Sequence, residues 1–208
     1  MAIHIGDHVP DFETETTTGP IKFYDWIGDS WVFFFSHPAD FTPVCTTEMG
    51  RTAQLADEFA KRNVKPLGLS TDTLASHMEW IKDVNETQNT VLEFPIVADF
   101  DRKVAKLYDM IHPGENTTEA VRSVFIIDPK QKLRLTMTYP MNVGRNFDEI
   151  LRVIDALQLA DAKKVATPAD WEVGDAVIIP PSISNEQARD IFPQGWEEIK
   201  PYLRKVKV

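Results

Sequence analysis

Cysteine is almost absent from this sequence, since among 208 residues only Cys45 carries a thiol. One cysteine excludes a disulfide within the chain and a zinc site built from several cysteines. Small secreted proteins usually depend on disulfides, so a lone thiol favours a reducing compartment. Residues 1–10 have no long apolar core and do not predict a signal peptide. We therefore predict a cytoplasmic protein.

Long hydrophobic runs and an excess of positive charge are also missing. The most apolar run, Trp31–Phe35, has the length of one strand, whereas a membrane helix needs roughly 18 apolar residues. Asp and Glu number 32 against 22 Lys and Arg, which gives a formal net charge of -10. This charge disfavours binding to nucleic acid and to anionic membranes, so we expect neither as a partner.

The chain does contain short apolar segments that alternate with amphipathic ones. This order predicts an α/β protein with parallel strand pairing. The last two predicted strands are joined by a turn around Pro129, which adds an antiparallel pair and makes the sheet mixed. The predicted strands cover 31–37, 65–70, 94–98, 123–128 and 132–139, and the predicted helices cover about 43–62, 74–86, 102–108 and 146–159.

The C-terminal segment differs in character from the rest. After about Lys164, prolines interrupt every long element. We therefore divide the chain into a main domain, 1–164, and an extension, 165–208. The extension is too short to form an independent core, so we expect it to pack on its own domain or on another subunit.

Cys45 lies where a buried strand gives way to a helix. Thr42 is a good N-cap residue and Pro43 suits the first helical position, which places Cys45 in the first turn. Unpaired N–H groups and the helix dipole stabilise an anion there. Free cysteine has a pKa of about 8.5, and helix N-termini with nearby cations lower it to roughly 3.5–7.5. We therefore expect a reactive thiolate, the species that attacks a peroxide bond.

Several neighbours are candidates to assist the sulfur. The hydroxyl of Thr42 can lie on the same side of the first turn, and Pro38 would shape and dry the pocket wall. His37 is the only basic group in the loop, so a cation must come from elsewhere. Arg122, just before a predicted strand, is the best candidate, and Glu48 could hold its guanidinium as a bidentate partner.

These residues resemble the active-site motif of the peroxiredoxins, Pro38-x-x-x-Thr42-x-x-Cys45. The longer string Ser36–Glu48 is similar to the one-cysteine, peroxiredoxin-6-like branch. Similar segments extend over nearly the whole chain, and they are Gly28–Trp31, Tyr139-Pro140, Gly144–Ile150 and Val165–Trp171.

The resemblance implies a thioredoxin-like mixed sheet flanked by helices, with a C-terminal dimerisation extension. It implies that Cys45 is the peroxidatic cysteine, that Thr42 and Arg122 bind and polarise the peroxide, and that Pro38 shields the sulfenate. His37 and Arg145 match positions at or near the pocket. No metal and no cofactor is expected.

The implied function is antioxidant defence and redox homeostasis. The enzyme would reduce hydrogen peroxide and organic hydroperoxides to water and alcohols through a sulfenic acid on Cys45. Because the chain has no second cysteine, an external thiol of the glutathione or thioredoxin type must regenerate it. The expected assembly is a homodimer, or a higher oligomer built from it.

Two other functions start from the same residues. A peroxide sensor or holdase would share the first oxidation but would not turn over with any reductant. A purely structural thioredoxin-like module would have an unreactive thiol, because a lone cysteine is often a small buried hydrophobic residue. The position of Cys45 after Thr-Pro at a helix start favours the enzyme.

Overall fold

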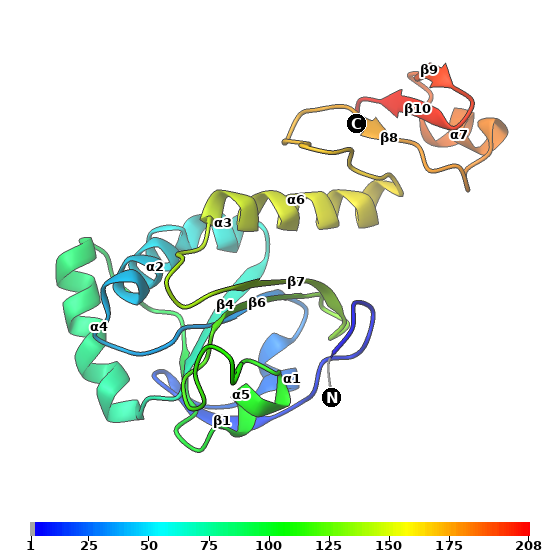
Figure 1. The fold of residues 1–208 in the computed structure, drawn as a ribbon. Helices are drawn as coiled ribbons and strands as arrows, with labels where there is room; N and C mark the ends of the chain where they lie inside the picture. The colour runs from blue at the N-terminus through cyan, green and yellow to red at the C-terminus, as the bar shows by residue number, and fades with distance from the viewer. Residues whose placement is uncertain (1–2) are drawn as a thin grey trace. The chain divides into compact units, whose positions relative to one another are not determined.

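The computed structural model describes residues 3–208, which form two units that divide after Phe147 (Figure 1). The first contains a seven-stranded sheet, and the second contains a three-stranded sheet. We predicted a boundary after residue 164 from the sequence. In the structure the second unit already starts at Asp148, so it includes most of the helix α6, Phe147–Lys163. Among residues 3–208, no helix is long and apolar enough to span a bilayer.

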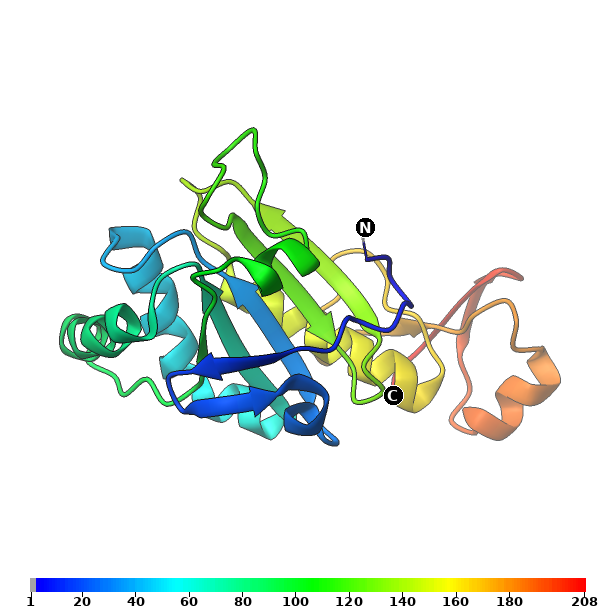
Figure 2. The same ribbon diagram turned by 90° about the horizontal axis from the view of Figure 1, so that it is seen from below.

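The large sheet is mixed, as the sequence predicted, with the strand order β2-β1-β5-β4-β3-β6-β7. Strand β3 pairs in parallel with β4 and antiparallel with β6, so it lies in the interior of the sheet and not at an edge (Figure 2). The strands are β1 Glu13–Thr16, β2 Gly19–Lys22, β3 Trp31–Ser36, β4 Val64–Ser70, β5 Ile96–Ala98, β6 Arg122–Ile127 and β7 Leu133–Tyr139.

Every residue of β3 is buried, because both faces of the sheet are covered there. Phe34 belongs to a core cluster on one face and packs against Phe23 and Tyr108. Phe33 points to the opposite face, where its ring stacks on Phe59 with centroids 5.4 Å apart. This double burial fixes the strand that leads into the loop before Cys45.

The helices of the first unit are α1 Phe23–Ile27, α2 Pro43–Gln54, α3 Ala56–Lys61, α4 Leu74–Gln88 and α5 Lys103–Leu107. The single helix predicted over 43–62 is two helices. Leu55 separates them with φ -93° and ψ 12°, outside the helical region, while its side chain is buried. The sequence pattern did not predict α1 or the hairpin β1–β2, whose strands carry few apolar residues.

The second unit contains the elements β8 Val177–Ile178, α7 Asn185–Ile191, β9 Glu197–Lys200 and β10 Leu203–Val206. Prolines do keep its elements short, as expected. Residues 165–208 nevertheless form a hydrophobic cluster of their own, which we did not predict from the sequence. Its buried members are Val165, Trp171, Val177, Ile179, Ala188, Phe192 and Val206.

Candidate active site

Cys45 occupies the third position of α2, as predicted, and it is fully buried. Thr42 is the N-cap residue, with extended φ and ψ of -114° and 147°, and Pro43 follows at the first helical position. The Thr42 hydroxyl does not cap the helix. It donates to the carbonyl of Ala39 at 2.8 Å instead. The Thr42 side chain therefore accepts no hydrogen bond from the backbone N–H groups of the first turn. The positive end of the helix therefore faces the sulfur uncapped.

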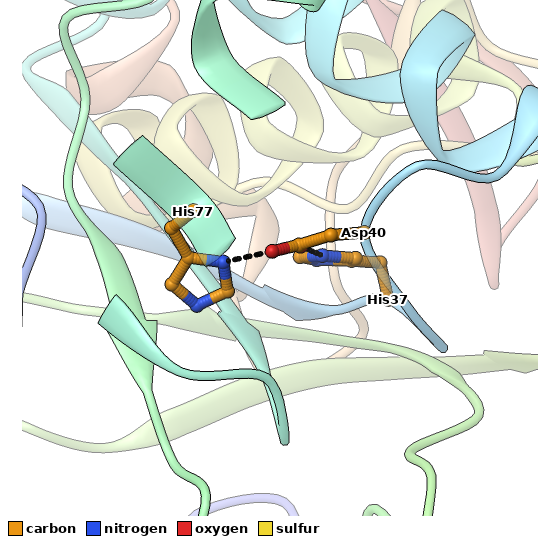
Figure 3. A group of neighbouring side chains, drawn as sticks. All are labelled: His37, Asp40 and His77. Atoms are coloured by element: carbon orange, nitrogen blue, oxygen red, sulfur yellow. Dashed lines mark hydrogen bonds and ion pairs between the residues drawn. The ribbon is translucent and has the colours of Figure 1, made fainter. Parts of the chain in front are cut away.

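The loop before α2 brings three buried side chains together (Figure 3). Nε2 of His37 lies 3.0 Å from one carboxylate oxygen of Asp40, and Nδ1 of His77 lies 2.8 Å from the other. Among residues 3–208, this is the one group of His, Cys, Asp and Glu side chains whose ligand atoms all lie within 4.8 Å and could share a metal ion. Asp40 and His77 were not among the predicted site residues.

The charges of this group are set by burial and by its hydrogen bonds. Burial lowers the pKa of His37, although the Asp40 carboxylate opposes that effect. Burial tends to raise the pKa of Asp40, but hydrogen bonds with His37 and His77 outweigh it and hold the pKa well below its usual range. Asp40 is therefore a carboxylate beside a neutral His37.

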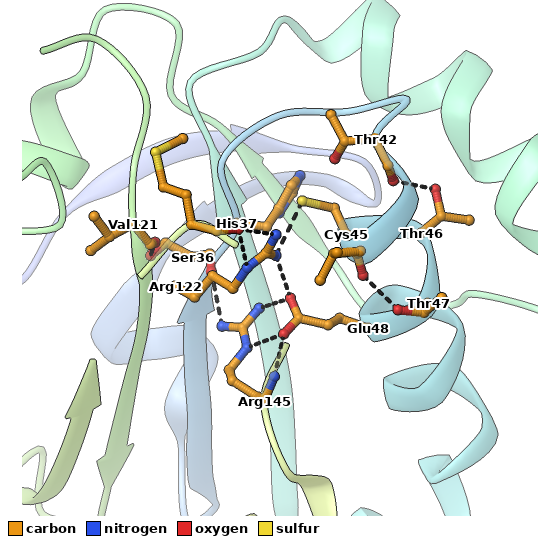
Figure 4. A network of polar contacts seen from close by, with 12 residues as sticks. Ser36, His37, Thr42, Cys45, Thr46, Thr47, Glu48, Val121, Arg122 and Arg145 are labelled. Carbon is orange, nitrogen blue, oxygen red and sulfur yellow. Dashed lines mark hydrogen bonds and ion pairs between the residues drawn. The ribbon is translucent and has the colours of Figure 1, made fainter. Parts of the chain in front are cut away.

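Arg122 supplies the cation that we expect beside the sulfur of Cys45. It is the first residue of β6, and its Nη1 lies 3.3 Å from the sulfur of Cys45 and 2.8 Å from Glu48 Oε2 (Figure 4). Its Nε and Nη2 both donate to the carbonyl of Met141, at 3.0 and 2.7 Å. These contacts fix the direction of the guanidinium toward the sulfur.

Glu48 holds a second guanidinium, that of Arg145 (Figure 4). Nε and Nη2 of Arg145 bind the two carboxylate oxygens at 3.0 and 2.5 Å, and its backbone N–H adds a third bond at 2.8 Å. Nη1 donates to the carbonyls of Ser36 and Ser123. Burial tends to raise the pKa of Glu48, but the two guanidinium groups, Arg145 foremost, lower it below its ordinary value.

The buried charges of this network do not cancel by themselves. One carboxylate, Glu48, faces two guanidinium groups, those of Arg122 and Arg145, and all three side chains are at least nine-tenths buried. A buried net positive charge is costly, so an anion beside it is stabilised. Arg122 Nη1 contacts the Cys45 sulfur, so the network places positive charge beside the sulfur.

The remaining predicted residue, Pro38, is buried directly after His37. The structure thus brings Thr42, Cys45, Glu48, Arg122 and Arg145 to one place, with the loop residues beside them. A cysteine at a helix N-terminus, in contact with a guanidinium, is an arrangement that enzymes with a cysteine nucleophile use.

Comparisons with known proteins identify the family of this chain. The AhpC/TSA family model matches residues 5–136, and the model for the C-terminal domain of 1-Cys peroxiredoxin matches residues 156–195. The chain is 54% identical to a 1-Cys peroxiredoxin of Dictyostelium discoideum over 97% of its own length and 84% of that protein. It is 52% identical to mouse Peroxiredoxin-6, over 96% of this chain and 95% of that one.

Solved structures give the same result. The yeast mitochondrial 1-Cys peroxiredoxin aligns with a TM-score of 0.94 at 52% identity and covers 99% of this chain and 100% of its own. A cysteine-to-serine mutant of the Peroxiredoxin 6 of Arenicola marina aligns at 0.93 with 46% identity, over 99% of this chain and 98% of that one. The chain therefore belongs to the AhpC/TSA family and, within it, to the one-cysteine peroxiredoxins. It is a thiol-dependent peroxidase with a thioredoxin-like fold.

Proposed function

We propose that Cys45 is the peroxidatic residue and that it reduces hydrogen peroxide and organic hydroperoxides. The thiolate attacks the terminal oxygen of the peroxide, an S–O bond forms and the O–O bond breaks. Hydroxide or alkoxide leaves with the electron pair and takes up a proton, giving water or an alcohol, while the sulfur becomes a sulfenic acid. The contact of Arg122 with both the sulfur and Glu48 is the observation that carries this proposal.

The neighbours of Cys45 have distinct roles in this step. Arg122 stabilises the thiolate and the negative charge that develops on the leaving oxygen. Glu48 and Arg145 keep that guanidinium in position. Thr42 offers its hydroxyl oxygen to the peroxide, because the hydroxyl hydrogen is already directed at Ala39.

The two loop residues complete the pocket in this proposal. His37 is buried beside the site and contacts the bound hydroperoxide. Pro38 keeps water from the sulfenic acid. Neither role involves a metal or a cofactor.

The sulfenic acid is reduced by an external thiol, since this chain has no second cysteine to form a disulfide. The thiol attacks the sulfur and releases water, and a second thiol then frees Cys45 from the mixed disulfide. The yeast relative is described as resolving through glutathione/thioredoxin systems. We propose a reductant of the same two kinds for this chain.

The protein works as a homodimer in the cytoplasm in this proposal. Exposed apolar side chains in the second unit, among them Val173 and Tyr202, support association. The lone free thiol supports a reducing compartment, and a fluorescent fusion would separate the cytoplasm from mitochondria, where the yeast relative is found.

Peroxide consumption with a panel of reductants tests the enzymatic proposal. With glutathione or thioredoxin we expect sustained turnover, and Cys45→Ser should abolish it while far-UV circular dichroism stays unchanged. Turnover that persists in Cys45→Ser would refute the assignment of the nucleophile. A single oxidation per chain with no reductant able to continue it would favour the peroxide sensor instead.

A further inference from the structure

His77 has no role in the proposed mechanism, although its side chain is completely buried and bound on both nitrogens. It lies on α4, and Nδ1 contacts Asp40 Oδ2 at 2.8 Å while Nε2 lies 3.2 Å from the carbonyl of Val97 on β5. The two buried imidazoles thus face one carboxylate from opposite sides (Figure 3). This arrangement joins α4 to the loop that precedes the reactive cysteine.

The carboxylate determines where the hydrogens of both histidines lie. Both oxygens of Asp40 accept hydrogen bonds. His37 reaches Oδ1, His77 reaches Oδ2, and Ser76 Oγ also donates to Oδ2 at 2.7 Å. A carboxylate has no hydrogen to donate, so His37 Nε2 and His77 Nδ1 must each carry one. In neutral His37 the other nitrogen, Nδ1, then has a lone pair and no hydrogen.

That nitrogen has no hydrogen-bond partner even though it is buried. A buried acceptor without a partner is costly and uncommon in native proteins, so it calls for an explanation. The His37 ring packs 5.1 Å from the Trp80 indole, whose Nε1 donates to Thr46, the residue after Cys45. Trp80 thus links the His37 ring to the helical turn that carries Cys45.

We propose that His77 is a positioning residue of the peroxidase: through Asp40 it keeps the hydrogen of His37 on Nε2, so that Nδ1 accepts the O–H of the hydroperoxide. The oxygen that Cys45 attacks keeps this hydrogen and becomes the sulfenic acid O–H. No proton moves to His37, and one acceptor holds the same O–H from substrate to product. The inference rests on the proposed function and adds a residue from α4 to it.

Two substitutions at position 77 separate positioning from packing. The amide nitrogen of asparagine can take the place of histidine Nδ1 and donate to Asp40, whereas that of glutamine can take the place of Nε2 and donate to Val97. We expect His77→Gln to slow the oxidation of Cys45 by about 10-fold, the size of one lost hydrogen bond to a charged group, and His77→Asn to stay within about threefold of the parent. The readout is the single-turnover rate of peroxide consumption, with the unfolding temperature of each variant as control.

The two variants also give the result that would overturn the proposal. A purely structural His77 ties α4 to β5 through Val97, so it predicts that His77→Asn is impaired as much as His77→Gln, or more. If the parent enzyme consumes peroxide and both variants keep its rate, the inference fails while the proposed function stands. If the parent is inactive, or Cys45→Ser remains active, the proposed function itself fails.

A spectroscopic measurement keeps the proposal testable if both variants unfold. Long-range 1H–15N correlation on the parent protein with 15N-labelled histidine should show His37 with hydrogen on Nε2 and none on Nδ1. A hydrogen on Nδ1 would overturn the inference. A zinc ion bound one per chain in the purified protein, and lost in His77→Gln, would also overturn the inference. A metal ion would then take the place of the hydrogens between His37, Asp40 and His77.

Discussion

Of the two arginines that bind Glu48, Arg122 is the one that contacts the sulfur of Cys45. Lysine at position 122 would keep the charge but lose the fork that binds Glu48, Met141 and the sulfur together. We expect Arg122→Lys to lower the rate of peroxide reduction about 100-fold, the cost of removing one electrostatic donor from an enzyme site. Single-turnover kinetics on the purified variant give this number.

Arg145→Lys is the matched control for that variant. Arg145 donates to Glu48 and to the carbonyls of Ser36 and Ser123, and its contacts do not include the sulfur. Its replacement should therefore reduce stability more than rate. An Arg145→Lys enzyme that is as slow as Arg122→Lys, at equal stability, would contradict the separate roles given to the two residues.

Glu48 should make the folded protein sensitive to acid. Its pKa is lower in the folded state than the ordinary 4.5, so the carboxylate contributes stability at pH values above 4.5. That contribution is lost as the pH falls from 4.5 through the lower folded pKa. Glu48→Gln removes the charge and leaves two guanidinium groups buried, which should cost about 3–5 kcal/mol at neutral pH.

Urea unfolding at a series of pH values measures this effect. The free energy of unfolding of the parent should fall below pH 4.5, whereas the curve of Glu48→Gln should lack this component. Equal pH dependence in the two proteins would show that Glu48 is not the group responsible.

Part of the site follows from rules about single residues. Thr-Pro before Cys45 predicts a helix start, and a reactive sulfur there needs a cation. Arg122 was a candidate for that cation, with Glu48 as its partner, but only the family resemblance favoured Arg122 over an ordinary surface arginine. Asp40 and His77 could not be found in this way. Their contact depends on how α4 lies against the loop. Asp40 lies within the string Ser36–Glu48, but nothing in that string indicates its partner, and His77 stands in no pattern that the sequence alone distinguishes.

At the scale of elements, α2 and α4 approach closely at Gly50. A Cβ at this position would lie 2.3 Å from Cγ and 2.5 Å from Cβ of Gln88, the last residue of α4. These atoms lie near the backbone, so the two helices would have to separate. Gly50→Ala should destabilise the protein by about 1–3 kcal/mol, the usual cost of overpacking.

Gly114→Ala provides the control, since nothing lies within 4 Å of a Cβ placed there. Its effect should stay within about 0.5 kcal/mol in the same denaturation experiment. Because α2 carries Cys45 and α4 carries His77, Gly50→Ala should also slow peroxide reduction. Equal stability of the two variants would contradict the close approach.

The elements that periodicity predicted well are the buried ones. Strands β3 and β6 are largely apolar and buried at every residue, because both of their faces are covered. The hairpin β1–β2 and the short strands of the second unit have mixed burial and few apolar residues, so their sequences lack a clear period. Their pairing comes from tertiary context, which no local pattern contains.

At the scale of the whole molecule, the net charge of -10 makes copies of the chain repel one another, so the proposed dimer needs an apolar surface. Val173 and Tyr202 are 72% and 69% exposed in the second unit, so large apolar side chains are available there for association. If this unit forms the proposed dimer, sedimentation equilibrium should give twice the mass of the chain, and Tyr202→Glu should shift the protein toward monomer. Glu198→Gln, exposed on β9 close to it in sequence, should leave the dimer intact.

The site around Cys45 lies within the first unit, so single-turnover oxidation in Tyr202→Glu should keep the parental rate. A parent protein that remains monomeric at all concentrations would rule out the dimer.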